Sequence, residues 1–269
     1  MTDPLEKHLG WDVKVPTREG KAVRLIDLAT HAGGFPREVP HESGPPNDPF
    51  ANITKQAFVA FLKGNDLLFA PGTGALYSNM GFDLLAAALA GAASKPYPDL
   101  LREHITQPLG MADTVFSLDD EQRGRLMQGH DFGGEPLFEV PRVRHPGLRR
   151  SLFDRQRHAG LAGMALGDAE MRLVDHAVWL QRDALSPVSG FDESGRMDGL
   201  SLAWIVMMPE GNRPLILQKA GGLQGIFCYA AFAPSRGIGA FIAINQFDFG
   251  AAMAMAAAVN DLIATLAPR

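Results

Sequence analysis

Residues 201–245 read SLAWIVMMPEGNRPLILQKAGGLQGIFCYAAFAPSRGIGAFIAIN, a succession of short apolar runs separated by turn residues. Glycine or proline stands in every gap between the runs. Runs of this length with turn residues between them are typical of strands joined by tight connections. The stretch therefore predicts a strand meander, in its simplest form an antiparallel sheet. The expected strands cover residues 202–208, 214–219, 225–232 and 238–245.

An amphipathic helix is expected to follow the meander and to cover one face of the sheet. The apolar residues that recur there at helical spacing are Met255, Val259, Leu262 and Leu266. Such a stripe marks the face of a helix that packs on other elements. Asn260 and Asp261 interrupt the apolar stretch from Ala251 to Ala267, so we expect no membrane span.

The first 200 residues are dominated by helical patterns and turn formers. Apolar residues at helical spacing predict helices over residues 54–63, 79–93, 97–106 and 169–182. A shorter amphipathic segment, residues 25–31, ends at two glycines, and residues 184–200 are expected to form a polar, glycine-rich loop. Helices first, then strands, then a covering helix is an α+β plan. We expect one domain over residues 1–269, with a helical and loop lobe at about 20–200 and a sheet lobe at about 201–269.

The composition is that of an ordinary globular chain, with 46% hydrophobic and 20% charged residues and a formal net charge of −5. This negative charge argues against nucleic acid as a partner. The histidines and the single cysteine, Cys228, show no zinc-binding spacing, so neither a metal nor a cofactor is expected, and Cys228 is expected to be a small buried side chain. A basic cluster, either an anion site or a solvated loop, is formed by Arg142, Arg144, Arg149 and Arg150.

Two short motifs carry functional side chains. Tyr77-Ser78-Asn79 lies between a Pro-Gly turn and a predicted helix, where Ser78 or Asn79 could simply cap that helix. Lys219-Ala220-Gly221-Gly222 ends one predicted strand, and its two glycines form the expected turn before the next. Each motif alone is weak, because a lysine before two glycines is also an ordinary hairpin end.

Taken together and in context, the motifs resemble those of one family. FAPGTGALYSNMGF at residues 69–82 is similar to the Pro-Gly and Tyr-Ser-Asn-x-Gly stretch of class C β-lactamases and related penicillin-binding proteins. VRLIDLATHAGGFP at residues 23–36 resembles their Leu-Leu-Thr-His-Thr-Ser-Gly-Leu-Pro block, and Lys219-Ala220-Gly221-Gly222 resembles their Lys-Thr-Gly motif. The chain is thereby identified as a member of the serine β-lactamase and penicillin-binding-protein family. Residues 37–40 resemble the D-alanyl-D-alanine carboxypeptidase/endopeptidase branch.

The resemblance implies a β-lactamase/transpeptidase-like fold and a periplasmic serine hydrolase that forms an acyl-enzyme with a β-lactam, a peptidoglycan stem peptide or an ester. Tyr77 matches the residue that moves a proton, and a phenol with an ordinary pKa of about 10 needs a nearby cation, for which Lys219 is the candidate. Asn79 matches the amide that binds the substrate's acyl-amide group, and Lys219 also suits a substrate carboxylate. Gly221 and Gly222 let the strand approach the ligand, and the Gly222 N–H would form half of an oxyanion hole.

Two departures from the family pattern stand out. Ala220 replaces a hydroxyl residue, which removes one hydrogen bond to a substrate carboxylate. No serine has a lysine three residues later, so the nucleophile motif Ser-x-x-Lys is absent. In the family that motif precedes an Asp-Pro-Leu stretch, here residues 3–5, so we expect the nucleophile helix and the two strands before it to be missing. The serines are Ser43, Ser78, Ser94, Ser117, Ser151, Ser186, Ser189, Ser194, Ser201 and Ser235.

Three interpretations follow from these departures: an enzyme fragment, a binding module that keeps substrate recognition without acyl transfer, and the product of a decayed gene. The first residues also show no signal-peptide pattern. In the first two interpretations, the Tyr77 phenol, the Asn79 amide and the Lys219 ammonium are expected to converge on one cleft at the edge of the C-terminal sheet.

Overall fold

The computed structural model describes residues 1–45, 48–137, 169–192, 195–223 and 225–269. The expected basic cluster around Arg142 lies outside these residues. The chain forms two compact units, and each is assembled from segments that are distant in sequence. Of the described residues, unit 1 comprises 1–45, 48–117 and 184–190. Unit 2 comprises 118–137, 169–183, 191–192, 195–223 and 225–269.

Unit 1 is mainly helical. Its helices are α1 (Leu5–Leu9), α2 (Leu25–Ala29), α3 (Lys55–Gly64), α4 (Asn79–Ala93) and α5 (Tyr97–Leu101), which continues into a π-helical turn, η1 (Arg102–Thr106). The strands β1 (Ala75–Leu76) and β3 (Val188–Ser189) form a short parallel pair. The helices predicted from residues 54–63, 79–93 and 97–106 are therefore confirmed, the last one as an α-helix followed by a π-turn.

The core of unit 1 forms around α4. Met80, Leu84 and Ala88 recur at intervals of four residues on one face of this helix and are fully buried. They join an apolar cluster to which α1, α2 and α3 also contribute. Ser94 ends α4 in the left-handed conformation, and its N–H bonds the carbonyls of Ala90 and Gly91.

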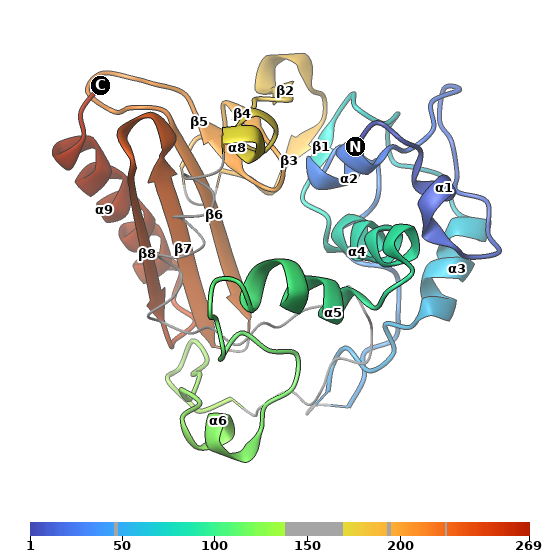
Figure 1. The fold of residues 1–269 in the computed structure, drawn as a ribbon, viewed down its shortest axis with the longest axis horizontal. Helices are drawn as coiled ribbons and strands as arrows, with labels where there is room; N and C mark the ends of the chain where they lie inside the picture. The colour runs from blue at the N-terminus through green and yellow to red at the C-terminus, as the bar shows by residue number, and fades with distance from the viewer. Residues whose placement is uncertain (46–47, 138–168, 193–194, 224) are drawn as a thin grey trace. The chain divides into compact units, whose positions relative to one another are not determined.

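Unit 2 contains a six-stranded antiparallel sheet in the order β2-β4-β5-β6-β7-β8 (Figure 1). Its strands are β2 (Leu180–Gln181), β4 (Gly199–Leu200), β5 (Ile205–Met207), β6 (Ile216–Leu223), β7 (Ile226–Ala233) and β8 (Ile238–Ile244). Its helices are α6 (Asp120–Gly124), α8 (Ala169–Asp175) and α9 (Phe249–Leu266), and its 3-10 turns include η3 (Pro234–Arg236). The predicted meander and the α+β class are confirmed.

The structure corrects three predictions between residues 169 and 223. The helix expected over residues 169–182 ends at Asp175, because Leu180 pairs with Leu200 across the sheet. The loop expected over residues 184–200 begins within the 3-10 turn η2 (Arg182–Ala184) and contains β3 and β4. The glycines 221 and 222, expected to form a turn, lie inside β6, where they pair with Cys228 and Phe227. Long-range pairing overrides local propensity at all these places.

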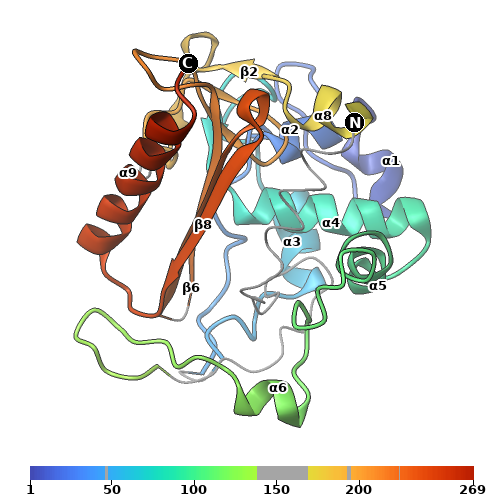
Figure 2. The ribbon, with the colours of Figure 1, turned by 60° about the vertical axis from the view of Figure 1, so that its left-hand side comes forward.

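The helix α9 lies along the sheet in both views (Figures 1 and 2) and closes the second core. The predicted stripe is half right: Met255 and Val259 are buried, but Leu262 and Leu266 are exposed, and Ile263 is buried instead. The other buried residues of this helix are Ala252, Ala256, Asn260 and Ala264. By length and composition α9 could cross a membrane, a test that core helices of globular proteins also pass.

A polar bond explains why α9 is rotated from the predicted orientation. The buried Tyr229 hydroxyl on β7 donates to the Asn260 Oδ1 at 2.8 Å. A buried phenol left without a partner would cost free energy, so the helix must turn Asn260 toward the sheet. Small alanines on the same side allow the close approach, and Leu262 and Leu266 lie on the exposed face of the helix.

Candidate active site

The Tyr77-Ser78-Asn79 motif forms the N-terminal end of α4. Ser78 is the N-cap: its Oγ accepts the Gly81 N–H at 2.9 Å and donates to the Pro36 carbonyl at 2.6 Å. The serine is buried, with 3% of its surface exposed. Both hydrogen-bonding functions of the hydroxyl are thus used inside the fold. Ser78 holds the motif in place, and its two flanking side chains remain half-buried.

A second segment, residues 31–38, holds the motif in place through hydrogen bonds. The Ser78 N–H donates to Nδ1 of the buried His31 at 3.1 Å, which requires a neutral imidazole with its proton on Nε2. The Arg37 carbonyl accepts the N–H groups of Asn79 at 2.8 Å and Met80 at 3.1 Å. The Leu76 N–H bonds the His31 carbonyl at 3.1 Å. The Thr-His-Ala-Gly-Gly-Phe-Pro block is therefore a structural partner of the Tyr-Ser-Asn turn.

Tyr77 is packed by three residues of unit 1, which are His31, Arg37 and Gly190. The His31 ring stacks on the Tyr77 ring with centroids 4.7 Å apart and an interplanar angle of 29°. The Arg37 guanidinium carbon lies 5.0 Å from the centroid of the Tyr77 ring. Gly190 approaches from the end of β3 at a φ of +83°, and a Cβ there would lie 2.9 Å from the Tyr77 Cβ. A glycine is needed at this position on both counts.

The Asn79 amide is held by a carboxylate. Its Nδ2 donates to Oε1 of Glu38 at 2.6 Å. A carboxylate only accepts hydrogen bonds when ionised, so this contact decides which end of the amide faces Glu38. The carbonyl end, Oδ1, is turned the other way. One N–H and the Oδ1 of Asn79 are then not engaged by Glu38.

Lys219 lies on β6 of unit 2, directly after the residues of β6 that pair with β5. The β5 partners of β6 are residues 216–218, whereas β7 pairs with residues 217–223. The part of β6 from Lys219 to Leu223 therefore pairs with β7 and lies outside the ladder with β5. Lys219 is half-buried, and burial lowers its pKa to about 8 because the charged ammonium loses hydration.

The neighbours of Lys219 on β6 point in alternating directions. Ala220 packs with the cluster beneath α9, so Lys219 and Gly221 belong to the opposite face of the sheet. Gly222 is exposed, and its Cβ position is crowded by the rings of Phe227 and Phe247 at 3.1 and 3.2 Å. Cys228, opposite Gly221, is half-buried, and burial raises the pKa of its thiol to about 11. This thiol is unsuited to act as a nucleophile in place of serine.

The structure thus groups the predicted site residues into two sets. Tyr77 and Asn79 flank the cap of α4 in unit 1, while Lys219 and its two glycines lie on one strand of unit 2. Sequence reasoning missed the contacts of Arg37 and Glu38, which served there only as a mark of the family branch. Their charge was visible in the sequence, but about forty residues separate them from the side chains that they touch. Among the described residues, no cluster of three metal-ligating side chains exists.

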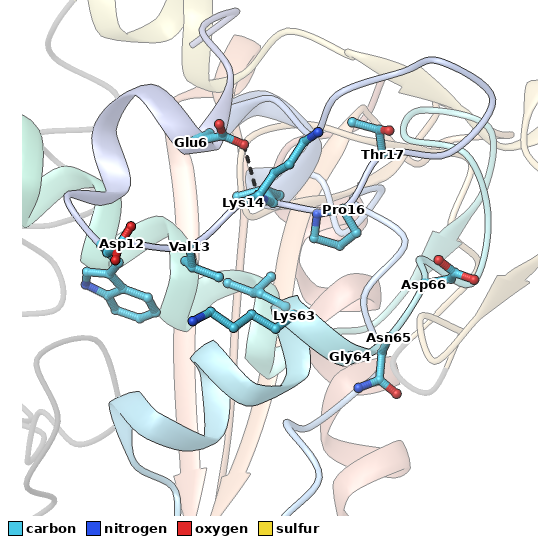
Figure 3. A pocket seen from close by; sticks show the side chains of 13 residues that line it. Glu6, Asp12, Val13, Lys14, Pro16, Thr17, Lys63, Gly64, Asn65 and Asp66 are labelled. Carbon is cyan, nitrogen blue, oxygen red and sulfur yellow. Dashed lines mark hydrogen bonds between the residues drawn. The ribbon is translucent and has the colours of Figure 1, made fainter.

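A separate open hollow lies in unit 1 between the N-terminal segment and the end of α3 (Figure 3). Charged side chains including Glu6, Lys14 and Lys63 surround it, and the Val15 N–H donates to the Glu6 carboxylate at 3.0 Å. None of the predicted site residues lines this hollow. The hollow is therefore distinct from the two motifs.

Comparison with known proteins matches almost the whole chain. The family described as Beta-lactamase matches residues 1–265. The chain is 34% identical to the D-alanyl-D-alanine-carboxypeptidase/endopeptidase AmpH of Escherichia coli K12, over 99% of this chain and 69% of that protein. A β-lactamase/D-alanine carboxypeptidase from Yersinia pestis, solved with citrate, has a TM-score of 0.81 and 35% identity, covering 98% of this chain and 76% of that one.

The fold likeness extends further than the sequence likeness. A class C β-lactamase from Rhodobacter sphaeroides has a TM-score of 0.70 at 22% identity, covering 98% of this chain and 77% of that one. At that identity the likeness concerns the fold alone, and it confirms the expected β-lactamase/transpeptidase-like architecture. With the family match over residues 1–265 and the AmpH identity, the conclusion is direct: this chain belongs to the β-lactamase family, alongside D-alanyl-D-alanine carboxypeptidases.

Proposed function

We propose that this chain carries the substrate-binding half of a serine hydrolase site of the β-lactamase/D-alanyl-D-alanine carboxypeptidase type. The observation that carries the proposal is the intact, braced Tyr77-Ser78-Asn79 turn in a chain of this family. Its substrates are β-lactams, peptidoglycan stem peptides or simple esters, and, as the family resemblance implies, it works in the periplasm.

Each proposed role follows from the chemistry of the side chain. Asn79 presents an oriented amide to the acyl-amide group of the substrate. Lys219 presents an ammonium to the carboxylate of the substrate. Gly221 and Gly222 let the part of β6 outside the β5 ladder lie against the substrate. Tyr77 accepts a proton from the attacking group or donates one to the leaving group. A serine nucleophile and its lysine would complete the acyl transfer, and these 269 residues contain no Ser-x-x-Lys.

The first experiment tests acyl transfer by the chain itself. We expect no covalent labelling when the purified 269-residue chain is incubated with a fluorescent penicillin, because Ser78 caps α4 and none of the serines precedes a lysine by three residues. A labelled band that disappears when the protein is denatured before labelling would show that another nucleophile is present.

The second experiment tests recognition. A calorimetric titration of the chain with a D-Ala-D-Ala peptide is expected to show saturable binding. Asn79→Ala and Lys219→Met should each weaken it about tenfold, which corresponds to roughly 1.4 kcal/mol. Asn52→Ala and Lys21→Met are matched controls at exposed positions and should bind like the unmodified chain. Absence of saturable binding would overturn the proposal.

A non-catalytic binding module for D-Ala-D-Ala-like peptides is the second candidate, favoured by the missing Ser-x-x-Lys. Reading the genomic DNA immediately 5′ of the Met1 codon separates the two. An in-frame Ser-x-x-Lys supports the hydrolase. Peptide binding without any such codons supports the binding module.

A further inference from the structure

The Arg37 guanidinium lies over the Tyr77 ring, 5.0 Å from its centroid, although Arg37 is exposed to solvent. Its backbone is fixed, because the Arg37 carbonyl accepts two N–H groups at the start of α4. The segment that orients the motif therefore also places a positive charge over the Tyr77 ring. All these contacts lie within unit 1.

A cation within about 6 Å of an aromatic centroid is attracted to the ring face. The attraction grows when the phenol ionises, because the phenolate oxygen adds a full negative charge. We propose that Arg37 is a positioning residue that favours the phenolate form of Tyr77 and so prepares it to accept a proton. The guanidinium stays protonated throughout, so the phenol proton is released to solvent and not to Arg37. The benefit to catalysis rests on the proposed role of Tyr77.

Other charged and titratable groups act on the same phenol. The stacked His31 ring is neutral while its Nδ1 accepts the Ser78 N–H, so it adds no full charge in that state. The Glu38 carboxylate, which bonds the neighbouring Asn79, opposes ionisation of the phenol. Lys219 of unit 2 is the cation that the family resemblance adds. Removing the Arg37 charge alone therefore isolates the contribution of Arg37 to the ionisation of Tyr77.

The test follows the ionisation of Tyr77 by pH titration of protein labelled with ¹³C at the tyrosine ring carbon that bears the hydroxyl. The chain has three tyrosines, and burial raises the pKa of both Tyr97 and Tyr229, which moves their signals to higher pH. The Tyr77→Phe variant assigns the remaining signal. Titration needs neither a ligand nor a nucleophile.

Arg37→Met is expected to raise the Tyr77 midpoint by about half a pH unit, the size that an exposed cation over a ring supports. Arg37→Lys keeps the charge and should leave the midpoint closer to that of the unmodified chain. Arg102→Met removes an equal charge that pairs with Asp99, and should have no effect. High salt should shrink the difference between the unmodified chain and Arg37→Met.

Equal midpoints in the unmodified chain and Arg37→Met would overturn the proposal, as would an Arg37→Lys midpoint that matches Arg37→Met. Either result would leave the peptide-binding test of the proposed function untouched. Conversely, a shifted midpoint in a chain that binds no D-Ala-D-Ala peptide would support the Arg37 effect and count against the proposed function alone.

Discussion

At the scale of single residues, two side chains adjacent in sequence meet the two functional side chains of the motif. Arg37 lies over Tyr77, and Glu38 accepts from Asn79. Each of these contacts limits what its target can do: a cation over a ring favours a negative phenolate, and a carboxylate dictates the orientation of an amide. The family motif is therefore in contact with a charged pair that lies outside it.

Replacing Glu38 by glutamine should release the Asn79 amide. A glutamine side chain can donate or accept, so it no longer selects one orientation of the amide. We expect Glu38→Gln to shift the Asn79 side-chain amide signals in a ¹⁵N NMR spectrum and to weaken D-Ala-D-Ala peptide binding several-fold, on the order of 1 kcal/mol. Glu42→Gln, at an exposed position on the same segment, is the control. Unchanged amide signals in Glu38→Gln would contradict the orienting role.

The lowered pKa of Lys219 predicts how ligand affinity depends on pH. The folded pKa of about 8 means that the ammonium is charged below that pH and becomes neutral above it. Affinity for a ligand carboxylate should therefore be full below pH 8 and fall as the pH rises through that value, by up to about tenfold per pH unit. Calorimetric titrations from pH 6 to pH 10, values chosen to lie about two units on either side, measure this. Lys219→Met should abolish the trend, and a flat profile in the unmodified chain would exclude Lys219 as the carboxylate ligand.

At the scale of elements, helices with strong local signals were predicted well, and elements that depend on distant partners were not. The helix α4 begins and ends where predicted, since Ser78 caps it and its apolar residues repeat at helical spacing. By contrast, β2 and β4 have two residues each and exist because they pair with one another and with β5. A strand of two residues is too short for a local sequence pattern to predict it.

The orientation of α9 offers a sharp test, because adjacent residues have opposite environments. Ile263 is 1% exposed and Leu262 is 49% exposed. Ile263→Ala should lower the free energy of unfolding in urea by about 2–5 kcal/mol, since it leaves a cavity under the sheet. Leu262→Ala is the matched control and should cost less than about 1 kcal/mol. A larger loss for Leu262→Ala than for Ile263→Ala would mean that α9 packs through the stripe predicted from the sequence.

At the scale of the whole molecule, each unit has its own buried core. Unit 1 has a cluster around α4, and unit 2 has a cluster between α9 and the sheet. A chain with two such cores is expected to fold, which the decayed-gene interpretation does not predict. The net charge of −5 is also compatible with a dispersed protein and gives no support to nucleic-acid binding.

We therefore expect the purified chain to unfold cooperatively on heating. Circular dichroism should show one or two sharp transitions, because each buried core is lost as a unit. Size-exclusion chromatography of the same sample reports whether the folded material stays free of aggregates. A gradual loss of signal without a transition, together with aggregation, would favour the decayed gene over both functional interpretations.

The amino-acid sequence alone was enough for the α+β class, the meander of residues 201–245, the helix α4 and the Tyr77, Asn79 and Lys219 candidates, because these rest on local periodicity and on short motifs. Folding in three dimensions was needed for the contacts of Arg37 and Glu38, the pairing of Gly221 and Gly222 within β6, and the rotation of α9. Each of these depends on a partner remote in sequence. Burial and hydrogen-bond satisfaction, which select such partners, are properties of the folded chain and not of any local stretch.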